Sequence, residues 1–460
     1  MENVKKTELF ESPPIPKAVA VLAIPTIVSS LVMVLYNLAD TYFVSMLNDP
    51  IQNSAVTLAA PVLLAFNAIN NLFGVGSSSM MSRAMGKRDF DTFSRSSAFG
   101  FYGSLSFGVL LAVLCTVFKT PLLHLLGADV TTAEATSEYM LWTVTFGTVP
   151  SILNVVLAYM VRSEGNTLHA SIGTMFGCVL NIILDPIFIL PASLNMGAAG
   201  AGLATFISNC AACSYFFILL MVTRKKTYIR LGIGYFGFKR SILLGVIAVG
   251  LPAAIQNLLN VTGMTVLNNF TSVFGADAIT AMGITQKISL VPMYISMGLG
   301  QGIMPLVGYT YASGDIKRMK SAISFSVKIA IGFLTAIAAV FFVTSGGLIA
   351  LFMKNSSVVA YGSRFLRGFS LSLPFLGLDF LAVGVFQACG MGKQSLVFAI
   401  LRKVALEIPA LYLLNFLFPL YGLAYAQLCA EVVLAAAAAV ILVRMIRRLE
   451  INQKDTHQQN

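Results

Sequence analysis

Charged residues are scarce in this chain. Only 11% of its 460 residues are Asp, Glu, Lys or Arg, whereas 57% are apolar. A soluble globular domain carries about 25% charged residues. The length alone would allow two or three soluble domains, but the composition excludes that interpretation and indicates an integral membrane protein.

The groups that serve catalysis and metal binding are scarce as well. The three histidines, His124, His169 and His457, are too scattered for a metal site, and the six cysteines lie in apolar runs, where they are expected to pack as small apolar groups. Gly392-Lys393 lacks the first glycine and the Ser or Thr of a phosphate-binding loop. We therefore expect that the protein is not an enzyme, has no catalytic residues and no cofactor, and does not work with an ATPase subunit.

Long apolar runs are what the chain has instead. A helix needs about 20 mostly apolar residues to cross a bilayer, and twelve such runs follow one another. They cover approximately residues 15–46, 54–82, 95–118, 134–161, 167–190, 197–222, 240–273, 278–311, 321–352, 358–388, 394–418 and 420–446. The first run is too long for a cleavable signal peptide and contains Asp40, which suits a retained span. The runs predict an all-α protein with twelve transmembrane helices.

The positions of the basic residues predict the orientation of these helices. With residues at the edge of a run counted in the nearest loop, twenty-four of the 30 Lys and Arg fall at the termini or in even-numbered loops. The odd-numbered loops hold Lys119 and Lys354, and four more lie within runs: Lys287, Lys328, Arg364 and Arg367. By the positive-inside rule both termini are cytoplasmic, in the cell membrane. The net charge of +11 is thus an orientation signal, and we expect no nucleic-acid partner.

The two halves of the chain repeat one another. Ala23-Ile24-Pro25 matches Gly250-Leu251-Pro252, and the same order recurs at a nearly fixed offset in three further pairs: Gly74-Val75-Gly76 with Gly300-Gln301-Gly302, Arg88-Asp89 with Gly314-Asp315, and Gly165 with Gly392. An even number of spans per half gives both halves the same orientation. We predict two parallel six-helix lobes with a central cavity. The expected parts are a tail at 1–14, an N-lobe at 15–222, a linker at 223–239, a C-lobe at 240–446 and a tail at 447–460.

Acidic residues are rare inside the apolar runs. Of the nineteen in the chain, five lie there: Asp40, Asp185, Asp379, Glu407 and Glu431. A carboxylate in lipid is costly, so such residues usually face an internal cavity and mark the path of an ion, a proton or a substrate. This pattern favours an ion-coupled transporter.

Two of these acids have suitable neighbours in the first half. Thr174, Gly177, Asn181 and Asp185 share one helical face, and Pro186 predicts an irregular backbone there. Asp40 follows Tyr36 and Asn37, with Pro25 about 22 Å before it along a helix. Thr205 adds a hydroxyl that could complete a shell of oxygen ligands for a small cation. The simpler interpretation is that Asn and Thr form polar contacts between neighbouring helices. An aspartate is a costly residue for such a contact, because its charge must be buried.

The second half offers a weaker candidate site. Asp379 lies in the tenth run, and Asn260 in the seventh. Lys287 could pair with Asp379 or Glu407, which would make those carboxylates structural. Met33 and Met175 in the first half could line an adaptable cavity for drugs.

Taken together, residues 15–446 resemble the multidrug and toxic compound extrusion (MATE) family. The resemblance depends on the twelve spans in two halves and on four motifs: Pro25 with Asp40, Asn181-Ile182-Ile183-Leu184-Asp185-Pro186, Gly202-Leu203-Ala204-Thr205, and Arg162-Ser163-Glu164-Gly165-Asn166. It implies a transporter that exports cationic, amphipathic drugs in exchange for H⁺ or Na⁺.

Individual residues carry over from the family. Asp40, Asn181, Asp185 and Thr205 match the N-lobe cation or proton site of the DinF-like branch, and Pro25 matches the proline around which the first span bends. Tyr36 and Asn154 match cavity residues there. The NorM-like branch has an acidic pair in the C-lobe. Asp379 fits one member, but Asn260 stands at the other position, which favours the N-lobe site.

The resulting hypothesis is antiport by alternating access. A carboxyl group in a low-dielectric site holds a proton more readily than in water, so Asp40 and Asp185 could exchange one. A lipid-linked oligosaccharide flippase is the alternative, but it should line its cavity with cations, and no Lys or Arg lies deep in the first six spans. A channel and a membrane enzyme are weaker alternatives. A cavity within one chain makes a monomer sufficient, with small-molecule drugs and the bilayer as partners.

Overall fold

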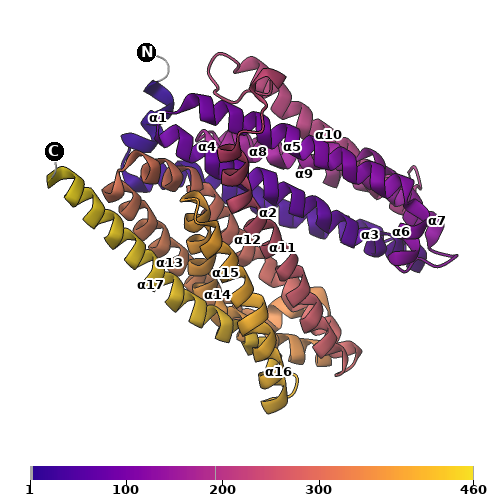
Figure 1. Ribbon diagram of the computed structural model, residues 1–460. Helices are drawn as coiled ribbons and strands as arrows, with labels where there is room; N and C mark the ends of the chain where they lie inside the picture. Colours follow the sequence, from indigo (N-terminus) through magenta and orange to yellow (C-terminus); the bar gives the residue numbers. More distant parts are fainter. Residues whose placement is uncertain (1–3, 192, 459–460) are drawn as a thin grey trace. The chain divides into compact units, whose positions relative to one another are not determined.

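The computed structural model describes residues 4–191 and 193–458, and regular structure in these ranges is helical. Residues 1–3 and 459–460, the outer ends of the predicted tails, lie outside the described part, as does Ala192. Residues 4–11 of the predicted N-terminal tail form helix α1, and residues 447–458 of the C-terminal tail continue helix α17. Figure 1 shows the helices in chain order.

In the first half the elements are α1 (Val4–Glu11), α2 (Ile15–Ser45), α3 (Pro50–Ile69), η1 (Asn70–Val75), α4 (Gly76–Gly86), α5 (Phe90–Val117), α6 (Lys119–Leu125), α7 (Ala133–Met140), η2 (Leu141–Phe146), α8 (Thr148–Ser163), α9 (Thr167–Ile189) and α10 (Gly197–Val222). In the second half they are η3 (Ile233–Tyr235), α11 (Arg240–Ser272), α12 (Ala276–Ser313), α13 (Ile316–Phe352), α14 (Ser356–Ala388), α15 (Gly392–Ile400), η4 (Leu401–Glu407), α16 (Ile408–Leu417) and α17 (Leu423–Gln458).

Each predicted apolar run corresponds to a helix or to a broken series of helices. Within the described ranges, ten helices are long and apolar enough to cross a membrane, and an eleventh span consists of α7–η2 and α8 with a bend of 48°. The remaining run, 394–418, forms α15, η4 and α16. Arg402, Lys403 and Glu407 lie in its middle, which explains why it is too charged to qualify by composition.

In the described part of the chain, three spans are interrupted by a π-helical turn: η1, η2 and η4. Such turns leave backbone groups partly unpaired and are frequent at functional sites. The irregular backbone predicted near Asp185 is wrong, because α9 continues through Pro186 to Ile189. The Ser193 hydroxyl donates to the carbonyls of Pro186 and Ile187 at 2.9 and 2.7 Å, so the last turn is closed by a side chain.

The described chain divides into two compact units. Unit 1 contains residues 4–11 and 28–254, and unit 2 contains residues 12–27 and 255–458. The divisions fall inside α2 and α11, two residues after Pro25 and two residues after Pro252. The first part of each of these helices therefore packs in the unit formed mainly by the other half of the sequence.

Glycines at equivalent positions of the repeat make this exchange possible. In unit 2, a Cβ on Gly302 of α12 would lie 2.6 Å from Cα of Ala23 and 3.0 Å from the Leu22 carbonyl oxygen. In unit 1, a Cβ on Gly76 of α4 would collide with the carbonyl oxygen of Val246 in α11. Since the obstructing atoms belong to the backbone, only glycine allows each helix to approach so closely.

The turn after the second span confirms the repeat at atomic detail. Asp89 accepts a hydrogen bond from the Thr92 N–H at 3.0 Å and caps α5, and Asp315 accepts one from the Arg318 N–H at 3.0 Å and caps α13. The residues before them, Arg88 and Gly314, both have positive φ, 55° and 80°. Gly165 (φ 84°) has its counterpart in Gly390 (φ 77°) rather than in Gly392, which begins α15.

In unit 2 the apolar core gathers around α14. Phe365, Leu366 and Phe369 of this helix pack with Met282 of α12 and Leu423 of α17. Many large apolar side chains elsewhere are exposed, which suits helices that face lipid.

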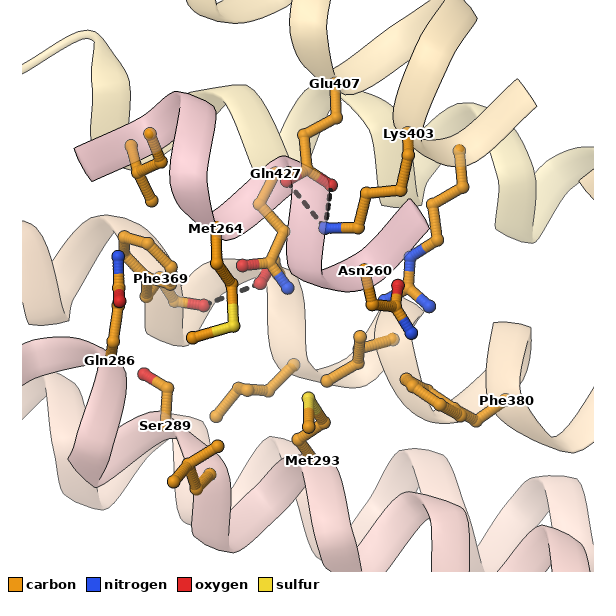
Figure 2. A pocket seen from close by; sticks show the side chains of 17 residues that line it. Asn260, Met264, Gln286, Ser289, Met293, Phe369, Phe380, Lys403, Glu407 and Gln427 are labelled. Carbon is orange, nitrogen blue, oxygen red and sulfur yellow. Dashed lines mark hydrogen bonds and ion pairs between the residues drawn. The ribbon is translucent and has the colours of Figure 1, made fainter. Parts of the chain in front are cut away.

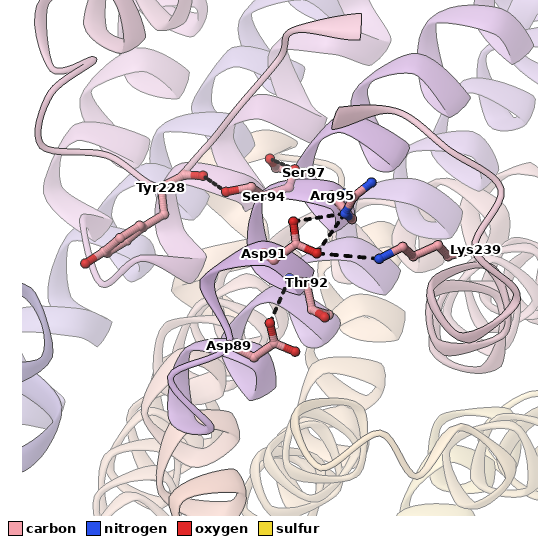
Figure 3. A network of polar contacts seen from close by, with 8 residues as sticks. All are labelled: Asp89, Asp91, Thr92, Ser94, Arg95, Ser97, Tyr228 and Lys239. Carbon is pink, nitrogen blue, oxygen red and sulfur yellow. Dashed lines mark hydrogen bonds and ion pairs between the residues drawn. The ribbon is translucent and has the colours of Figure 1, made fainter. Parts of the chain in front are cut away.

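The linker between the halves is fixed to unit 1 (Figure 3). The hydroxyl of Ser94 in α5 donates to the carbonyl of Tyr228 at 2.8 Å. The hydroxyl of Tyr102, also in α5, donates to the carbonyl of Leu231 at 2.8 Å. Glu164, in the turn after α8, accepts from the Tyr228 N–H at 2.6 Å and from the Thr227 hydroxyl at 2.9 Å. This explains the Glu of the Arg162–Asn166 motif as an anchor for the linker.

Candidate functional site

Unit 1 brings the predicted N-lobe residues together. Tyr36 and Asp40 come from α2, Asn181 and Asp185 from α9, and Thr205 from α10. We call these five residues the unit 1 acid cluster. Asn181 and Asp185 are 1% and 0% exposed, so burial here places a carboxyl group and its amide neighbour out of reach of water.

Asn181 connects the acid to the neighbouring helix. In the orientation that satisfies all its partners, its amide nitrogen donates to Oδ2 of Asp185 at 2.9 Å. Its oxygen then accepts from the hydroxyl and the N–H of Thr205 at 3.2 and 3.1 Å. Tyr36 of α2 lies near Thr205. Hydrogen bonds thus connect Asp185 and Asn181 on α9 to Thr205 on α10, with Tyr36 of α2 beside them.

Asp40 and Asp185 lie close enough to repel one another when both are charged, and both lie near the phenol of Tyr139 in α7. None of the ion pairs found among the described residues involves either aspartate. Two like charges without a cation favour uptake of a proton or a small cation. The available ligand atoms are carboxylate, amide, hydroxyl and phenol oxygens.

The other predicted residues of the first half lie around this region. The Asn154 side chain donates to Oδ1 of Asn209 at 2.7 Å, which gives it a helix–helix contact between α8 and α10. Met33 and Met175 are half-buried in α2 and α9. Pro25 lies within α2 without ending it.

Unit 2 holds a second cluster of buried charges. Arg402 lies between two acids: its Nη1 is 3.4 Å from Oδ2 of Asp379, and its Nη2 donates to Oε1 of Glu431. Lys403 contacts both oxygens of Glu407 at 2.7 and 2.6 Å. We call these five residues the unit 2 ion cluster. All are less than 10% exposed.

Two expectations about the charges of the second half are wrong. Lys287 is exposed, and Arg402 and Lys403 are the partners of Asp379 and Glu407. We assigned Arg402 and Lys403 to the nearest loop from the sequence, although they are the ninth and tenth residues of an apolar run. Their position in the middle of that run, with Glu407 four residues after Lys403, could have indicated a buried ion pair. Asn260 lies near them, in the wall of a cavity (Figure 2).

The described residues contain no group of three or more His, Cys, Asp or Glu side chains that could hold a metal ion. Comparison with known proteins gives the class of protein in which the two clusters occur. The MatE family model matches this chain twice, at residues 25–187 and 252–413. The chain belongs to the MatE family.

The two matched segments begin at Pro25 and Pro252, which confirms the internal repeat. The multidrug export protein MepA of Staphylococcus saprophyticus is 34% identical over 97% of both chains. Solved structures of MATE in a bent and in a straight conformation have TM-scores of 0.88 and 0.90, with 25% and 26% identity, and cover 97% of this chain and 99% of theirs. The predicted family and two-lobe α-helical fold are confirmed, and this MatE protein is a multi-pass membrane transporter rather than an enzyme.

Proposed function

We propose that this MatE protein is a secondary-active exporter of cationic and amphipathic drugs, driven by H⁺ or Na⁺ that binds the unit 1 acid cluster. One observation carries the proposal: Asp40 and Asp185 lie near one another without an ion-pair partner among the described residues, and Asn181 and Thr205 hold one of them in place. The multidrug export activity in the name of the MepA relative is consistent with it.

The mechanism follows from charge. With no ion bound, Asp40 and Asp185 repel each other, and the two titrate as a coupled pair. A proton or Na⁺ removes this repulsion, so α2 and α9 approach more closely around the bound ion. Asp40 is in the part of α2 that belongs to unit 1, whereas Pro25 is in the part that belongs to unit 2. Proline removes a backbone hydrogen bond, and α2 changes its bend there when the charge at Asp40 changes.

The orientation and setting complete the proposal. The excess of Lys and Arg at the termini and in even-numbered loops supports an orientation with both ends of the chain in the cytoplasm. We infer a location in the cell membrane and a functional monomer, because each cluster is formed by residues of a single chain.

Uptake of ethidium into proteoliposomes tests the proposal. A pH gradient and a Na⁺ gradient are imposed separately, with and without an ionophore that collapses each one. Uptake that depends on one gradient supports ion-coupled export and identifies the ion. Ethidium accumulation that neither gradient drives would contradict the proposal.

The flippase alternative deserves comparison, because Arg402 and Lys403 line a cavity in unit 2. A pyrophosphate site requires an excess of positive charge. The unit 2 ion cluster has three carboxylates for two cations, so its formal balance is negative. The charges therefore favour a cationic ligand over a pyrophosphate.

A further inference from the structure

The unit 2 ion cluster borders a cavity of about 110 Å³. Helices α11, α12 and α14 form its walls together with η4, and Figure 2 shows Lys403 and Glu407 above the methionines and phenylalanines. An apolar cavity of about 150 Å³ accommodates one benzene ring. The unit 2 cavity is smaller than this, so it suits the ammonium end of a ligand rather than a whole drug.

The lining of the cavity suits a positively charged group. Phe369 and Phe380 offer aromatic faces, Met264 and Met293 offer polarizable side chains, and Asn260 adds an amide. Aromatic faces attract cations, most strongly where water is excluded. Arg402 already lies over Phe380, with its Cζ 4.7 Å from the ring centroid.

With all five side chains counted as ionised, the charges around the cavity leave one negative charge in excess. Arg402 lies between Asp379 and Glu431, whereas Lys403 contacts Glu407 alone. A net charge in a low-dielectric interior is costly. One additional positive charge would balance the cluster, and a ligand can supply it.

The structure also offers a second place for the Lys403 ammonium group. Oδ1 of Asp379 and Oε2 of Glu431 are buried without a hydrogen-bond partner, and Lys403 interacts electrostatically with both acids. These two oxygens are therefore acceptors for the Lys403 ammonium group if it leaves Glu407. In its present position beside Glu407 the Lys403 side chain packs against Gly263, where a Cβ would lie 2.9 Å from its Cδ and 3.1 Å from its Nζ.

We propose that the unit 2 cavity binds the charged end of an organic monocation, with Glu407 as its anionic partner and Lys403 as an internal cation that the ligand displaces. This inference rests on the proposed function, since it assigns a recognition site to the exported cations. It makes Glu407 a specificity-determining residue: a neutral ligand cannot replace the ammonium group of Lys403.

Binding of tritiated benzyltrimethylammonium to the full-length protein in nanodiscs tests the site. This probe has one ring and one fixed charge, and neopentylbenzene is its neutral isostere. We expect Glu407→Gln to weaken binding of the cation at least tenfold and Lys403→Met to tighten it about tenfold. Binding of the neutral isostere should be equal in all variants. Lys403→Gln, which keeps a polar neighbour for Glu407, should tighten cation binding as well if Lys403→Met does not fold.

Opposite results would overturn the assignment. Weaker cation binding in the Lys403 variants, or unchanged binding in Glu407→Gln, would show that Glu407 does not recognise the ligand. Gradient-driven ethidium uptake by the wild type distinguishes a wrong binding site from a wrong transport function. If the wild type takes up ethidium but Glu407→Gln binds benzyltrimethylammonium unchanged, the proposed site alone is contradicted. If the variants bind as expected but the wild type takes up no ethidium, the transport proposal alone is contradicted.

Discussion

The side-chain amide of Asn181 donates a hydrogen bond to Oδ2 of Asp185 at 2.9 Å, one turn further along α9. The oxygen of the same amide accepts from Thr205 on α10. Asn181 thus connects α10 by hydrogen bonds to Asp185, the carboxyl group that we assign to ion binding. An aspartate held in this way has one oxygen engaged and the other available to an ion.

Thr205 tests the importance of this network. Thr205→Val removes the hydroxyl with little change of shape, whereas Thr205→Ser keeps it. A hydrogen bond of this kind contributes about 1 kcal/mol net, so we expect the ion concentration for half-maximal uptake to rise about fivefold in Thr205→Val. Uptake assays over a series of gradients measure it. Equal behaviour of the Val and Ser variants would exclude a role for the hydroxyl.

Glu164 is expected to stabilise the linker. Its carboxylate accepts from the Tyr228 N–H and the Thr227 hydroxyl, and its side chain is buried. Glu164→Gln should lower the free energy of unfolding by about 1–3 kcal/mol and speed tryptic cleavage at Arg224 and Lys225. Melting curves and timed digestion measure both effects. The exposed Glu138→Gln is the control, and a Glu164→Gln variant that behaves like it would refute the anchor.

Gly302 is expected to tolerate no side chain. A Cβ there meets backbone atoms of Ala23 and Leu22 at 2.6 and 3.0 Å, so Gly302→Ala should cost about 1–3 kcal/mol through overpacking. Gly332 lies in α13, and a Cβ there has nothing within 4 Å. Gly332→Ala should be neutral or stabilising by about 0.5–1 kcal/mol. Thermal unfolding in detergent compares the two, and equal melting temperatures would contradict the packing argument.

Asp89 predicts a pH dependence of stability. The hydrogen bonds from the side chain and N–H of Thr92 lower the pKa of this capping carboxyl below its ordinary value. A depressed folded-state pKa gives stability that is present above the ordinary value of about 3.9 and is lost as the pH falls through the lower one. Asp89→Ala should cost about 1 kcal/mol at pH 7. The melting temperatures of wild type and variant should converge as the pH falls through the lowered pKa of Asp89, and a difference that stays constant through that acid range would contradict the cap.

Much of this architecture could be predicted from the sequence, because apolar runs and internal repeats are properties of the sequence. The turn at Arg88-Asp89 and Gly314-Asp315 is the clearest case: a positive φ followed by a capping aspartate leaves a local pattern. The residues of the unit 1 acid cluster were predicted because aspartates are rare in apolar runs, and the structure brings those residues together. Their role in coupling stays a prediction.

Other features depend on packing and were not predictable. The first parts of α2 and α11 pack in the unit formed mainly by the other half of the sequence. This arrangement depends on which backbone segments approach Gly302 and Gly76. The partners of Asp379 and Glu407 come from the middle of the most interrupted span, where a π turn places Arg402 and Lys403 towards different acids. The spacing of these residues in the sequence does not indicate which acid each side chain faces.

The most direct test of the central claim compares gradient-driven ethidium uptake by wild type, Asp40→Asn and Asp379→Asn in proteoliposomes. The account predicts that Asp40→Asn abolishes the dependence on the ion gradient. Asp379→Asn should retain it, because Arg402 keeps Glu431 as a partner. Uptake that remains coupled in Asp40→Asn and is lost in Asp379→Asn would contradict the account and move the coupling site to unit 2.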